Sequence, residues 1–368
     1  MLIFEEVGPK MAGGSKAQRD VDGEQVNAAI DRGLAYLAEH QYPNGEFCCY
    51  IAIDEPMQGW CVTDSTVFAT MVVASCLVST EAHPASEHML RKATIYMQSQ
   101  QHHGPTWPVF SDRHRWHAAV PYDSDSLAYA SAFLQARGIV YPALNIPLLL
   151  ANRNRQGLFL TWFLLRPVWP RNRTHLRVTA KRLLHPLRNI LFWRANECDP
   201  DDVDMGINAN ILYYLGERPE TLPIVTALLR VIVEGREDDC DKWYRNRFSI
   251  YYLIARAYSK GAHGLAPARD LIVERILATA QRDGSFGTSI LDTAFAVSTL
   301  LLLDAPTAQV HQAVAALLDQ QTQAGNWVRW LFYYGGPQRS QGWGSEELTT
   351  GFCLEAVALY RAKFGISV

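Results

Sequence analysis

The sequence predicts an all-α protein, a closed barrel of six helical hairpins known as an (α/α)6 toroid. Two observations predict it: a helical unit that recurs along the 368 residues, and a second kind of helix, apolar on nearly all sides, that follows each copy. A third is that nothing in the chain reads as a β-sheet of any size. We expect a loose N-terminal tail over 1–24 and one barrel domain over 25–368, with a basic and aromatic insertion at about 140–195.

The recurring unit ends a helical pattern with an apolar residue, a glutamine four positions later, then a glycine and an aromatic ring. The helices that carry it are apolar on one side only, which places them on the outside of the barrel. The four copies are Leu37, Gln41, Gly45 and Phe47; Met97, Gln101, Gly104 and Trp107; Leu277, Gln281, Gly284 and Phe286; and Leu317, Gln321, Gly325 and Trp327.

The second kind of helix opens with an acid or hydroxyl group and is rich in alanine, serine and leucine. An acid, serine or threonine directly before an apolar run is a helix-start signal. Helices that are apolar all round are buried, so six of them, each paired with an outer helix, predict a closed inner ring. They begin at Asp64, Asp125, Asp204, Asp292 and Glu347, and near Phe248 without an acid.

Every inner helix of such a barrel begins at the same end. Ring closure therefore brings the opening acids, and the loops before them, to one mouth, which is the expected ligand site. The acids concerned are Asp64, Asp125, Asp202, Asp204, Asp292 and Glu347.

An unusually acidic stretch precedes the third inner helix. Capping of a helix start accounts for one or two carboxylates. The excess indicates either a site that holds a cation or proton, or a solvated loop. The acids are Glu197, Asp199, Asp201, Asp202 and Asp204. A second acidic group, formed by Asp238, Asp239 and Asp241, is interpreted as a solvated loop.

The segment between Asp125 and Glu197 contains no acid and many arginines, although the whole chain carries a formal net charge of −3. Within it, residues 153–194 interleave arginine with aromatic and apolar residues. This pattern suits an anionic-ligand wall, a membrane-surface contact or a nucleic-acid face, and also an insertion that covers the outside of the barrel. Nucleic acid is not expected, because the chain is acidic overall and carries no recognised binding motif.

Composition and the absence of known motifs exclude several classes of protein. Seven cysteines at no paired or metal-like spacing predict reduced core residues in a cytoplasmic protein, and no export signal or membrane-spanning run is found. The stretch 102–117 offers His103, Asp112, His114 and His117 as metal or acid–base groups. Their spacing matches no ligand pattern, so a mixed-charge loop is favoured and no metal site is predicted. P-loop, nucleophile-elbow and zinc-peptidase motifs are absent.

The repeats resemble those of the prenyltransferase and squalene-cyclase superfamily, whose (α/α)6 barrel is built from units ending in glutamine, glycine and an aromatic residue. The clearest copy is R-G-L-A-Y-L-A-E-H-Q-Y-P-N-G-E-F at 32–47. The resemblance covers most of 25–362 apart from 140–195, and it implies a single-barrel member. The zinc ligands of protein prenyltransferases, an Asp, a Cys and a His, are not matched by Asp292, Cys353 and His311.

Class II terpene cyclases of this superfamily carry an Asp-x-Asp-Asp motif whose middle acid protonates an alkene or epoxide. Asp199-Pro200-Asp201-Asp202 has this pattern, so the resemblance implies Asp201 as proton donor, oriented by Asp199 and Asp202. By comparison with the other inner helices, however, the acid that starts this helix is Asp204 and not Asp202. The match to the Asp-x-Asp-Asp motif is therefore incomplete. The chain also resembles bacterial single-barrel relatives that carry three short motifs, T-W, D-x-D and N-A-N. In this chain the motifs lie at 161–162, 202–204 and 208–210. This resemblance suggests that Asp202, Asp204, Asn208 and Asn210 form one polar site.

The leading hypothesis is a terpene-cyclase-like enzyme in which an acid cluster protonates an isoprenoid, such as a prenyl diphosphate, and aromatic rings shield the cation. The predicted catalytic residues are Asp199, Asp201, Asp202 and Asp204. The predicted substrate-binding residues are Asn208, Asn210, Asp125, Trp162, Arg171, Arg173, Trp330, Tyr333, Tyr334 and Trp343.

No cofactor is predicted, except Mg²⁺ if the substrate is a diphosphate. Segment 153–194 would hold the diphosphate or contact the membrane that supplies the substrate, and a homodimer would provide a second barrel. The alternatives are a non-catalytic isoprenoid- or lipid-binding scaffold, and a carbohydrate-active (α/α)6 enzyme that uses two mouth carboxylates such as Asp125 and Asp204.

Overall fold

The computed structural model describes residues 21–166, 172–180, 186–336, 338 and 340–367. Most of the predicted N-terminal tail, and Arg171 of the predicted ligand site, lie outside the described residues. The described chain is predominantly α-helical, which confirms the all-α prediction. None of the described helices is long and apolar enough to cross a membrane.

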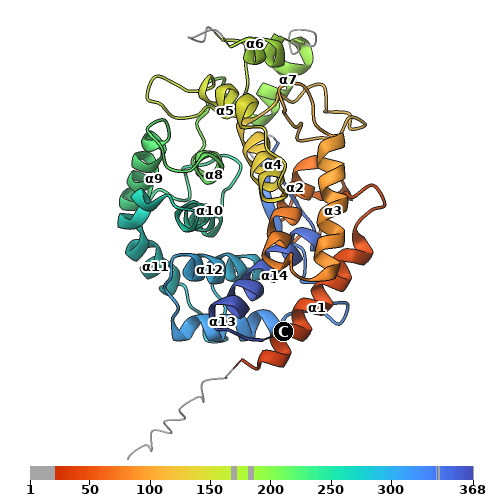
Figure 1. Cartoon of the computed structure of the whole chain (residues 1–368), viewed down its shortest axis with the longest axis vertical. Helices are drawn as coiled ribbons and strands as arrows, with labels where there is room; N and C mark the ends of the chain where they lie inside the picture. Colours follow the sequence, from red (N-terminus) through yellow and green to blue (C-terminus); the bar gives the residue numbers. More distant parts are fainter. Residues whose placement is uncertain (1–20, 167–171, 181–185, 337, 339, 368) are drawn as a thin grey trace, which may run out of the picture.

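Six helices form the inner ring of the barrel (Figure 1). Each packs against the next in chain order, and the last returns to the first, so the ring is closed. Nearly every side chain along these helices is buried, which is why their sequences are apolar on all sides. They are α2 (Val67–Leu77), α4 (Ser124–Ala136), α8 (Met205–Leu215), α10 (Arg247–Ser259), α12 (Ile290–Leu302) and α14 (Glu346–Lys363).

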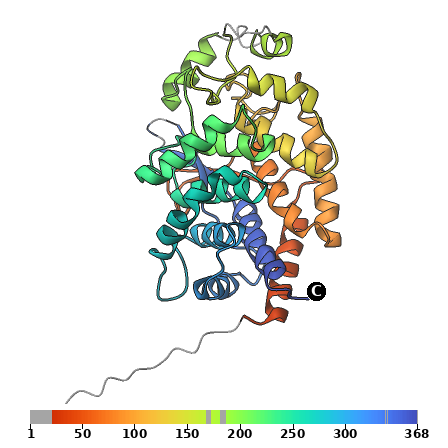
Figure 2. The ribbon, with the colours of Figure 1, turned by 60° about the vertical axis from the view of Figure 1, so that its left-hand side comes forward.

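A second layer of helices surrounds this ring, and the pairing of inner with outer helices confirms the toroid. The outer helices are α1 (Gly23–His40), α3 (Pro84–Ser99), α5 (Pro142–Leu150), α9 (Leu222–Glu234), α11 (Arg269–Leu277) and α13 (Ala308–Asp319). Short 3₁₀ turns, η1 (Val78–Thr80) and η3 (His263–Ala268), extend α2 and precede α11. Two further helices, α6 (Arg173–Ala180) and α7 (Pro186–Asn196), lie at one end of the long axis (Figures 1 and 2).

The glutamine of the repeated unit ties neighbouring outer helices together. Gln321, after α13, donates from Nε2 to the carbonyl oxygens of Gly325 and of Ala29 in α1, both at 2.8 Å. Gln41, after α1, likewise reaches the carbonyl of Met89 in α3 at 3.1 Å. The bond from Gln321 to α1 joins the last outer helix to the first, so the unit closes the outer layer.

In three of the four units, the aromatic residue ties its outer helix to the inner helix that follows. Its backbone N–H donates to a threonine hydroxyl in the first two turns of that inner helix, at 2.9–3.1 Å. The ring itself is buried, with 0–1% exposed. The pairs are Phe47 with Thr70, Phe286 with Thr293, and Trp327 with Thr350.

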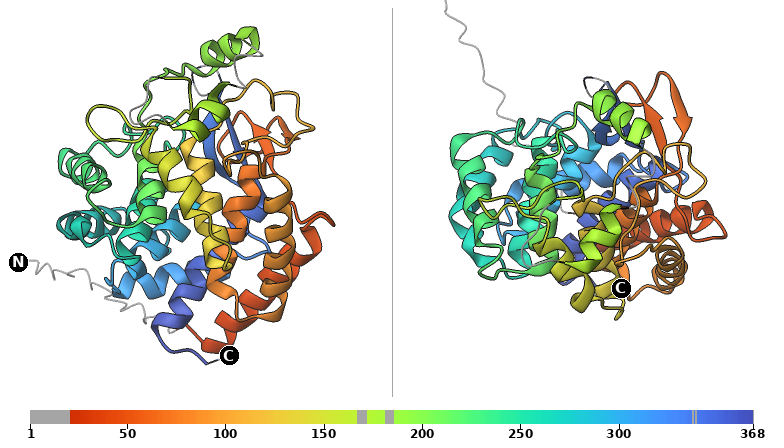
Figure 3. Two further views of the ribbon diagram at one scale, coloured as in Figure 1. Left: turned by 45° about the horizontal axis from the view of Figure 1, so that its top comes forward. Right: turned by 90° about the horizontal axis from the view of Figure 1, so that it is seen from above.

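A small sheet, which the sequence analysis does not predict, joins loops from the two ends of the chain. Its four antiparallel strands, in the order β2-β1-β4-β3, are only three to five residues long, too short for a sequence alternation to register. The β1–β2 hairpin stands out at the edge of the molecule (Figure 3, right). The strands are β1 (Tyr50–Ala52), β2 (Cys61–Thr63), β3 (Leu331–Gly335) and β4 (Gln341–Gly344).

The glycine of the last unit should be irreplaceable. Gly325 has a φ of +96°, and a Cβ added there would lie 2.3 Å from the carbonyl oxygen of Arg32 in α1. Backbone strain and forced separation of the helices together predict that Gly325→Ala lowers the free energy of unfolding by about 2–5 kcal/mol. Chemical denaturation of the purified variant measures this loss.

Gly261→Ala is the matched control. Gly261 has a φ of +109°, but a Cβ added there meets nothing within 4 Å, so the variant carries the backbone cost alone, about 1–3 kcal/mol. Equal losses in the two variants would show that the approach of Gly325 to α1 does not contribute to stability.

Candidate functional site

A cavity of about 680 Å³ opens at the end of the ring where the inner helices begin. Its walls come from the starts of α2, α4 and α8, from the loop between α3 and α4, and from the β3–β4 hairpin. The volume lies within the usual range for small-molecule sites, and most of the lining is apolar or aromatic. The rings that line it include Phe68, Phe110, Trp162, Trp243, Tyr333 and Trp343.

Two carboxyl groups at the start of α4 face this cavity. Asp123 is the N-cap residue, and its side chain accepts hydrogen bonds from the backbone N–H and the hydroxyl of Ser126, at 2.6 and 2.9 Å. Asp125 lies in the first turn of the same helix. The two residues are only 5% and 6% exposed, so both acids are buried at one wall of the cavity.

Asp125 is held by neutral donors from two other parts of the barrel. Asn210 of α8 donates from Nδ2 to Oδ1 at 2.8 Å, and the hydroxyl of Tyr244, before α10, donates to Oδ2 at 2.5 Å. Burial raises the pKa of Tyr244 well above its ordinary value, and the charge of Asp125 adds to this, so the phenol stays a donor. These bonds fix both oxygens of the carboxyl group.

Burial, and after it the neighbouring charge of Asp123, raise the pKa of Asp125 to about 7, against the lowering effect of the bonds from Tyr244 and Asn210. The pKa of Asp123 is raised to about 6, again mainly by burial. Removal from water disfavours the charged form of a carboxyl group, and a like charge nearby does the same. Asp125 can therefore carry a proton near neutral pH inside an apolar cavity.

The T-W segment predicted from the sequence lies beside the start of α4. Thr161 accepts from the backbone N–H of Ser124 at 2.8 Å, while its hydroxyl donates to Asp204 at 2.6 Å. This places the ring of Trp162 in the cavity wall, edge-on to Phe192, Trp193 and Trp243 with centroids 5.3–5.7 Å apart. The segment therefore links the acids of α4 to the start of α8.

The two asparagines of the N-A-N motif have different partners. Asn210 contacts Asp125, as described above. Asn208 bonds both the N–H and the carbonyl of Phe159, each at 3.0 Å, and so fixes the strand-like segment that carries Thr161 and Trp162. The predicted single polar site of Asp202, Asp204, Asn208 and Asn210 is therefore distributed: Asn210 reaches the cavity acid, and Asn208 supports the backbone.

Asp241 corrects one interpretation of the sequence. It is not part of a solvated loop: its side chain is buried and accepts three backbone N–H bonds at 2.8 Å, from Gly206, Trp243 and Tyr244. It thereby positions Tyr244, the partner of Asp125. The donors Trp243 and Tyr244 lie two and three residues after Asp241. This is the spacing of an Asx-type turn, a signal that the sequence does contain.

The opposite wall carries basic groups. His114 Nε2 lies 2.7 Å from Asp64 Oδ1, and the indole of Trp343 donates to Asp64 Oδ2 at 2.7 Å. Arg113 and Arg115 flank His114, line the cavity and are exposed at its outer side. We call Arg113, His114 and Arg115 the basic mouth of the cavity, whose lining also holds the two buried acids.

The acids predicted to be catalytic lie elsewhere. Asp199 and Asp201 are exposed, and Asp201 forms an ion pair with Arg166. Asp202 is buried but pairs with Lys242, and Asp204, the N-cap residue of α8, accepts from Thr161 and from the backbone N–H of Lys242. The cavity is not lined by these four residues, so their catalytic role stays a prediction that the geometry does not favour.

Among the predicted substrate-binding residues, Asp125, Trp162, Tyr333 and Trp343 line the cavity. The rings of Tyr333 and Trp343 stack at 5.3 Å with an interplanar angle of 10°.

Of the other predicted substrate-binding residues that the structure describes, none lines this cavity. Tyr334 packs in a separate apolar cluster with Met57 and Leu331 and donates to Glu55. Trp330 is half-buried against the main core, and Arg173 is exposed on α6.

Comparison with known proteins gives a structural likeness only. No protein family description and no curated protein sequence matches the chain. A type II terpene cyclase, MstE from Scytonema, in complex with geranylgeranyl dihydroxybenzoate as substrate, superposes with a TM-score of 0.67 at 16% identity, covering 93% of this chain and 99% of that chain. MstE with the product merosterolic acid A gives 0.66 at 17% identity, covering 93% and 98%.

Two further structures are similar. A protein from Actinoplanes gives a TM-score of 0.65 at 16% identity, covering 91% of this chain and 99% of that chain. The ent-copalyl diphosphate synthase from Streptomyces platensis gives 0.52 at 19% identity, covering 80% of this chain and 50% of that chain. The chain therefore has the fold of type II terpene cyclases, as the resemblance of its repeats implied.

The raised pKa of Asp125 should be visible in the pH dependence of stability. Between about pH 4, where an unfolded Asp titrates, and pH 7, the native chain holds a proton that the unfolded chain has released. The free energy of unfolding should therefore fall as pH rises through this window, by at most about 1.4 kcal/mol per pH unit for this group. Asp125→Asn should remove that fall, measured by urea denaturation from pH 4.5 to 7.5.

Asp239→Asn, an exposed acid in the turn before Asp241, is the control and should keep the wild-type slope. A slope that is the same in wild type and Asp125→Asn would mean that Asp125 is ionised throughout this range.

Proposed function

We propose that this protein is a type II terpene cyclase in which Asp125 protonates an isoprenoid substrate and starts its cyclisation. The observation that carries the proposal is a buried carboxyl group, with its pKa raised to about 7, in the wall of an aromatic cavity. An acid that attacks an alkene must be neutral and oriented, and this group is both. The likeness of the fold to MstE supports the same chemistry.

The two donors on Asp125 assign a role to each of its oxygens. Nδ2 of Asn210 can only donate, so Oδ1 remains an acceptor and the neutral acid carries its proton on Oδ2. The hydroxyl of Tyr244 donates to Oδ2, which leaves the acid proton on that oxygen free for the substrate. As the proton leaves, both bonds strengthen against the developing negative charge, which stabilises the transition state more than the ground state.

Asp123 keeps the proton of Asp125 available. Its pKa is the lower of the two, so it ionises first, and its charge opposes the ionisation of Asp125. Two carboxyl groups in different environments thus have separate roles, one charged and one acidic.

The aromatic rings would then stabilise the carbocation that protonation creates. Phe68, Trp162, Tyr333 and Trp343 line the cavity that also holds the acid, and a ring face turned to a desolvated cation attracts it by about 2 kcal/mol or more. Tyr333 is held by a hydrogen bond to Thr66 at 3.0 Å. Water is excluded by the same rings, which protects the cation from premature capture.

The basic mouth suits an anionic headgroup on the isoprenoid. Arg113 and Arg115 offer guanidinium donors at the entrance, the geometry that best matches a diphosphate or carboxylate. We therefore place the headgroup here rather than on Arg171 and Arg173, as the sequence suggested. Mg²⁺ dependence, which would accompany a diphosphate, stays a prediction.

The segment around α6 and α7 retains its predicted role at a membrane. It exposes Leu165, Leu176, Ile190 and Leu191, between 38% and 61%, among its arginines. Apolar side chains set among cationic ones are typical of peripheral contact with an anionic lipid surface. Peripheral membrane contact, a cytoplasmic location and a homodimer stay predictions.

Replacement of the acid tests the proposal. Wild type incubated with C10 to C30 prenyl diphosphates and with geranylgeranyl hydroxybenzoates should give cyclic products, with one deuterium incorporated per molecule in D₂O. Asp125→Asn should lower turnover by about 10²- to 10⁴-fold, because an amide cannot donate the proton to the alkene, while substrate binding persists. Product is measured by mass spectrometry and binding by calorimetry.

Asp201→Asn is the control, since that exposed acid is the proton donor implied by the sequence motif, and it should remain active. Full activity in Asp125→Asn would remove Asp125 as the donor. Tight binding by wild type without turnover of any substrate would support the isoprenoid-binding scaffold instead.

The headgroup site has its own test. Replacing both cavity arginines, as Arg113→Gln with Arg115→Gln, should raise KM for an anionic prenyl substrate about 10-fold or more, since each lost charged hydrogen bond costs about 1.5 kcal/mol or more. Arg173→Gln on α6 should leave KM unchanged. The reverse result would place the headgroup on the basic segment, as the sequence analysis first suggested.

A further inference from the structure

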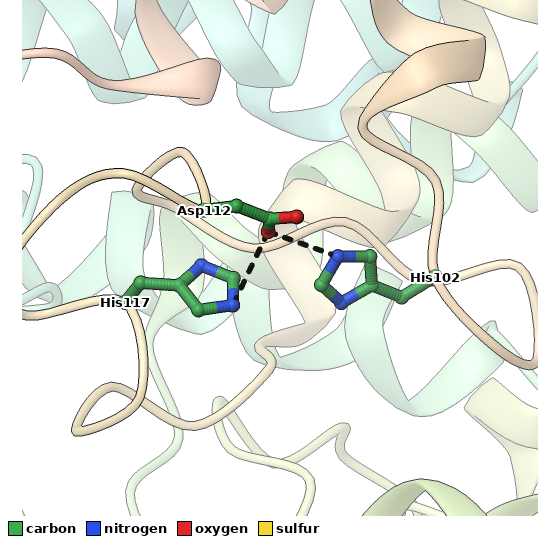
Figure 4. Close-up of side chains that lie close together, drawn as sticks. All are labelled: His102, Asp112 and His117. Atoms are coloured by element: carbon green, nitrogen blue, oxygen red, sulfur yellow. Dashed lines mark hydrogen bonds and ion pairs between the residues drawn. The ribbon is translucent and has the colours of Figure 1, made fainter.

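A cluster of two histidines and one aspartate lies in the loop between α3 and α4, separate from the buried acids (Figure 4). His102 Nε2 and His117 Nε2 lie 3.2 and 3.3 Å from the same oxygen, Oδ1 of Asp112. We propose that His102, Asp112 and His117 bind one divalent transition-metal ion, for which Zn²⁺ is the best match.

The structure changes the set of ligands that the sequence offered. His103 is exposed and does not belong to the cluster, while His114 bonds Asp64 at the cavity wall. His102 takes the place of both. The ligands come from positions that no local spacing rule joins, because the chain turns back between Gly104 and Phe110 to bring them together.

The far nitrogen of each ring supports a ligand role. His117 Nδ1 lies 3.0 Å from the carbonyl oxygen of Phe110, and only an N–H can make that bond. The neutral ring therefore presents a lone pair on Nε2 towards Asp112. His102 Nδ1 is similarly occupied, 2.5 Å from the Tyr122 hydroxyl. Metal-bound histidines characteristically anchor their other nitrogen in this way.

An imidazole lone pair and a carboxylate oxygen 3.3 Å apart repel each other unless a positive charge lies between them. His102 can donate from Nε2 to Asp112 as a neutral ring when Tyr122 donates to its Nδ1. His117 has no such neutral form, because its N–H is held by the carbonyl of Phe110. One metal ion would satisfy both imidazoles and the carboxylate at once.

The separations match a zinc site. Bonds of about 2.0–2.1 Å in a tetrahedron place the ligand atoms about 3.3 Å apart. The two measured separations from Asp112 Oδ1 are 3.2 and 3.3 Å, and all three ligand atoms lie within 4.8 Å of one another. Imidazole nitrogens favour zinc and its neighbours over Mg²⁺ or Ca²⁺.

Access and coordination number also fit. The Asp112 side chain is 68% exposed and the two histidines 23%, so an ion enters from solvent. Three protein ligands leave a fourth position for water.

The ion would clamp the wall of the cavity. Asp112 and His117 bracket residues 113–116, all four of which line the cavity. His102 anchors this short loop to the end of α3, and its partner Tyr122 directly precedes Asp123. Metal binding would therefore order the basic mouth without entering the cavity.

Zinc binding by the full chain, stripped with chelator and titrated by calorimetry, tests the proposal. We expect one Zn²⁺ per chain. His117→Ala and Asp112→Asn should each weaken binding by at least about 100-fold, beyond what loss of an outer hydrogen-bond partner causes. His103→Ala is the matched control and should bind as wild type does. Asp112→Asn alters an exposed side chain, so its fold, checked by circular dichroism, should persist.

Proteolysis gives an independent readout. Arg113 and Arg115 are exposed trypsin sites inside the proposed clamp, so Zn²⁺ should slow cleavage there in wild type and His103→Ala. It should give no protection in His117→Ala or Asp112→Asn. If wild type takes up no Zn²⁺ saturably, or if the ligand variants bind and are protected like wild type, the cluster is a hydrogen-bonded group only and the proposal is wrong.

Discussion

Closure of the helical ring is the constraint on which the rest of this molecule depends. The hydrogen bond from Gln321 to Ala29 and the approach of Gly325 to Arg32 join the last outer helix to the first. Because every inner helix enters the ring from the same side, closure gathers their N-terminal ends, and the polar groups found there, around one space. The position of the cavity is therefore determined by the topology of the barrel, whereas its chemistry is determined by individual residues.

At this end of the ring, the hydrogen-bond and ion-pair partners of each acid determine whether it is held as a carboxylate or can keep a proton. Asp64 is matched by His114 and an indole N–H, and Asp202 by the ammonium group of Lys242. Asp241 is matched by three backbone N–H groups. Asp125 instead receives an amide and a phenol, which orient it without supplying a positive charge. Burial then holds its proton in place.

The sequence predicts the architecture well because the architecture is repeated. Glutamine, glycine and an aromatic residue recur at fixed spacing, and the helices that follow are apolar all round, so both layers of the barrel can be read directly. The fold class, and the rings of Trp162, Tyr333 and Trp343 in the cavity wall, could be predicted from the sequence.

The identity of the acid could not be predicted from local pattern. Asp199, Asp201 and Asp202 form the conspicuous motif, yet Asp201 lies beside Arg166 at the surface. Asp125 looks like an ordinary helix-start residue, and its properties come from Asn210 and Tyr244, 85 and 119 residues away. Desolvation and long-range partners carry no local signal, which also explains why His102 was overlooked.

The pairing of β1 with β4 has a consequence for the order in which the protein assembles. Ile51 lies opposite Trp343, so one wall of the cavity needs segments almost 300 residues apart. Contacts of such sequence separation form late, since the intervening chain must first be ordered. During synthesis Asp125 emerges long before its partner Tyr244, and longer still before the last aromatic wall. Under the proposed function, the acid would become buried, and the space beside it dry, only when the final residues have folded.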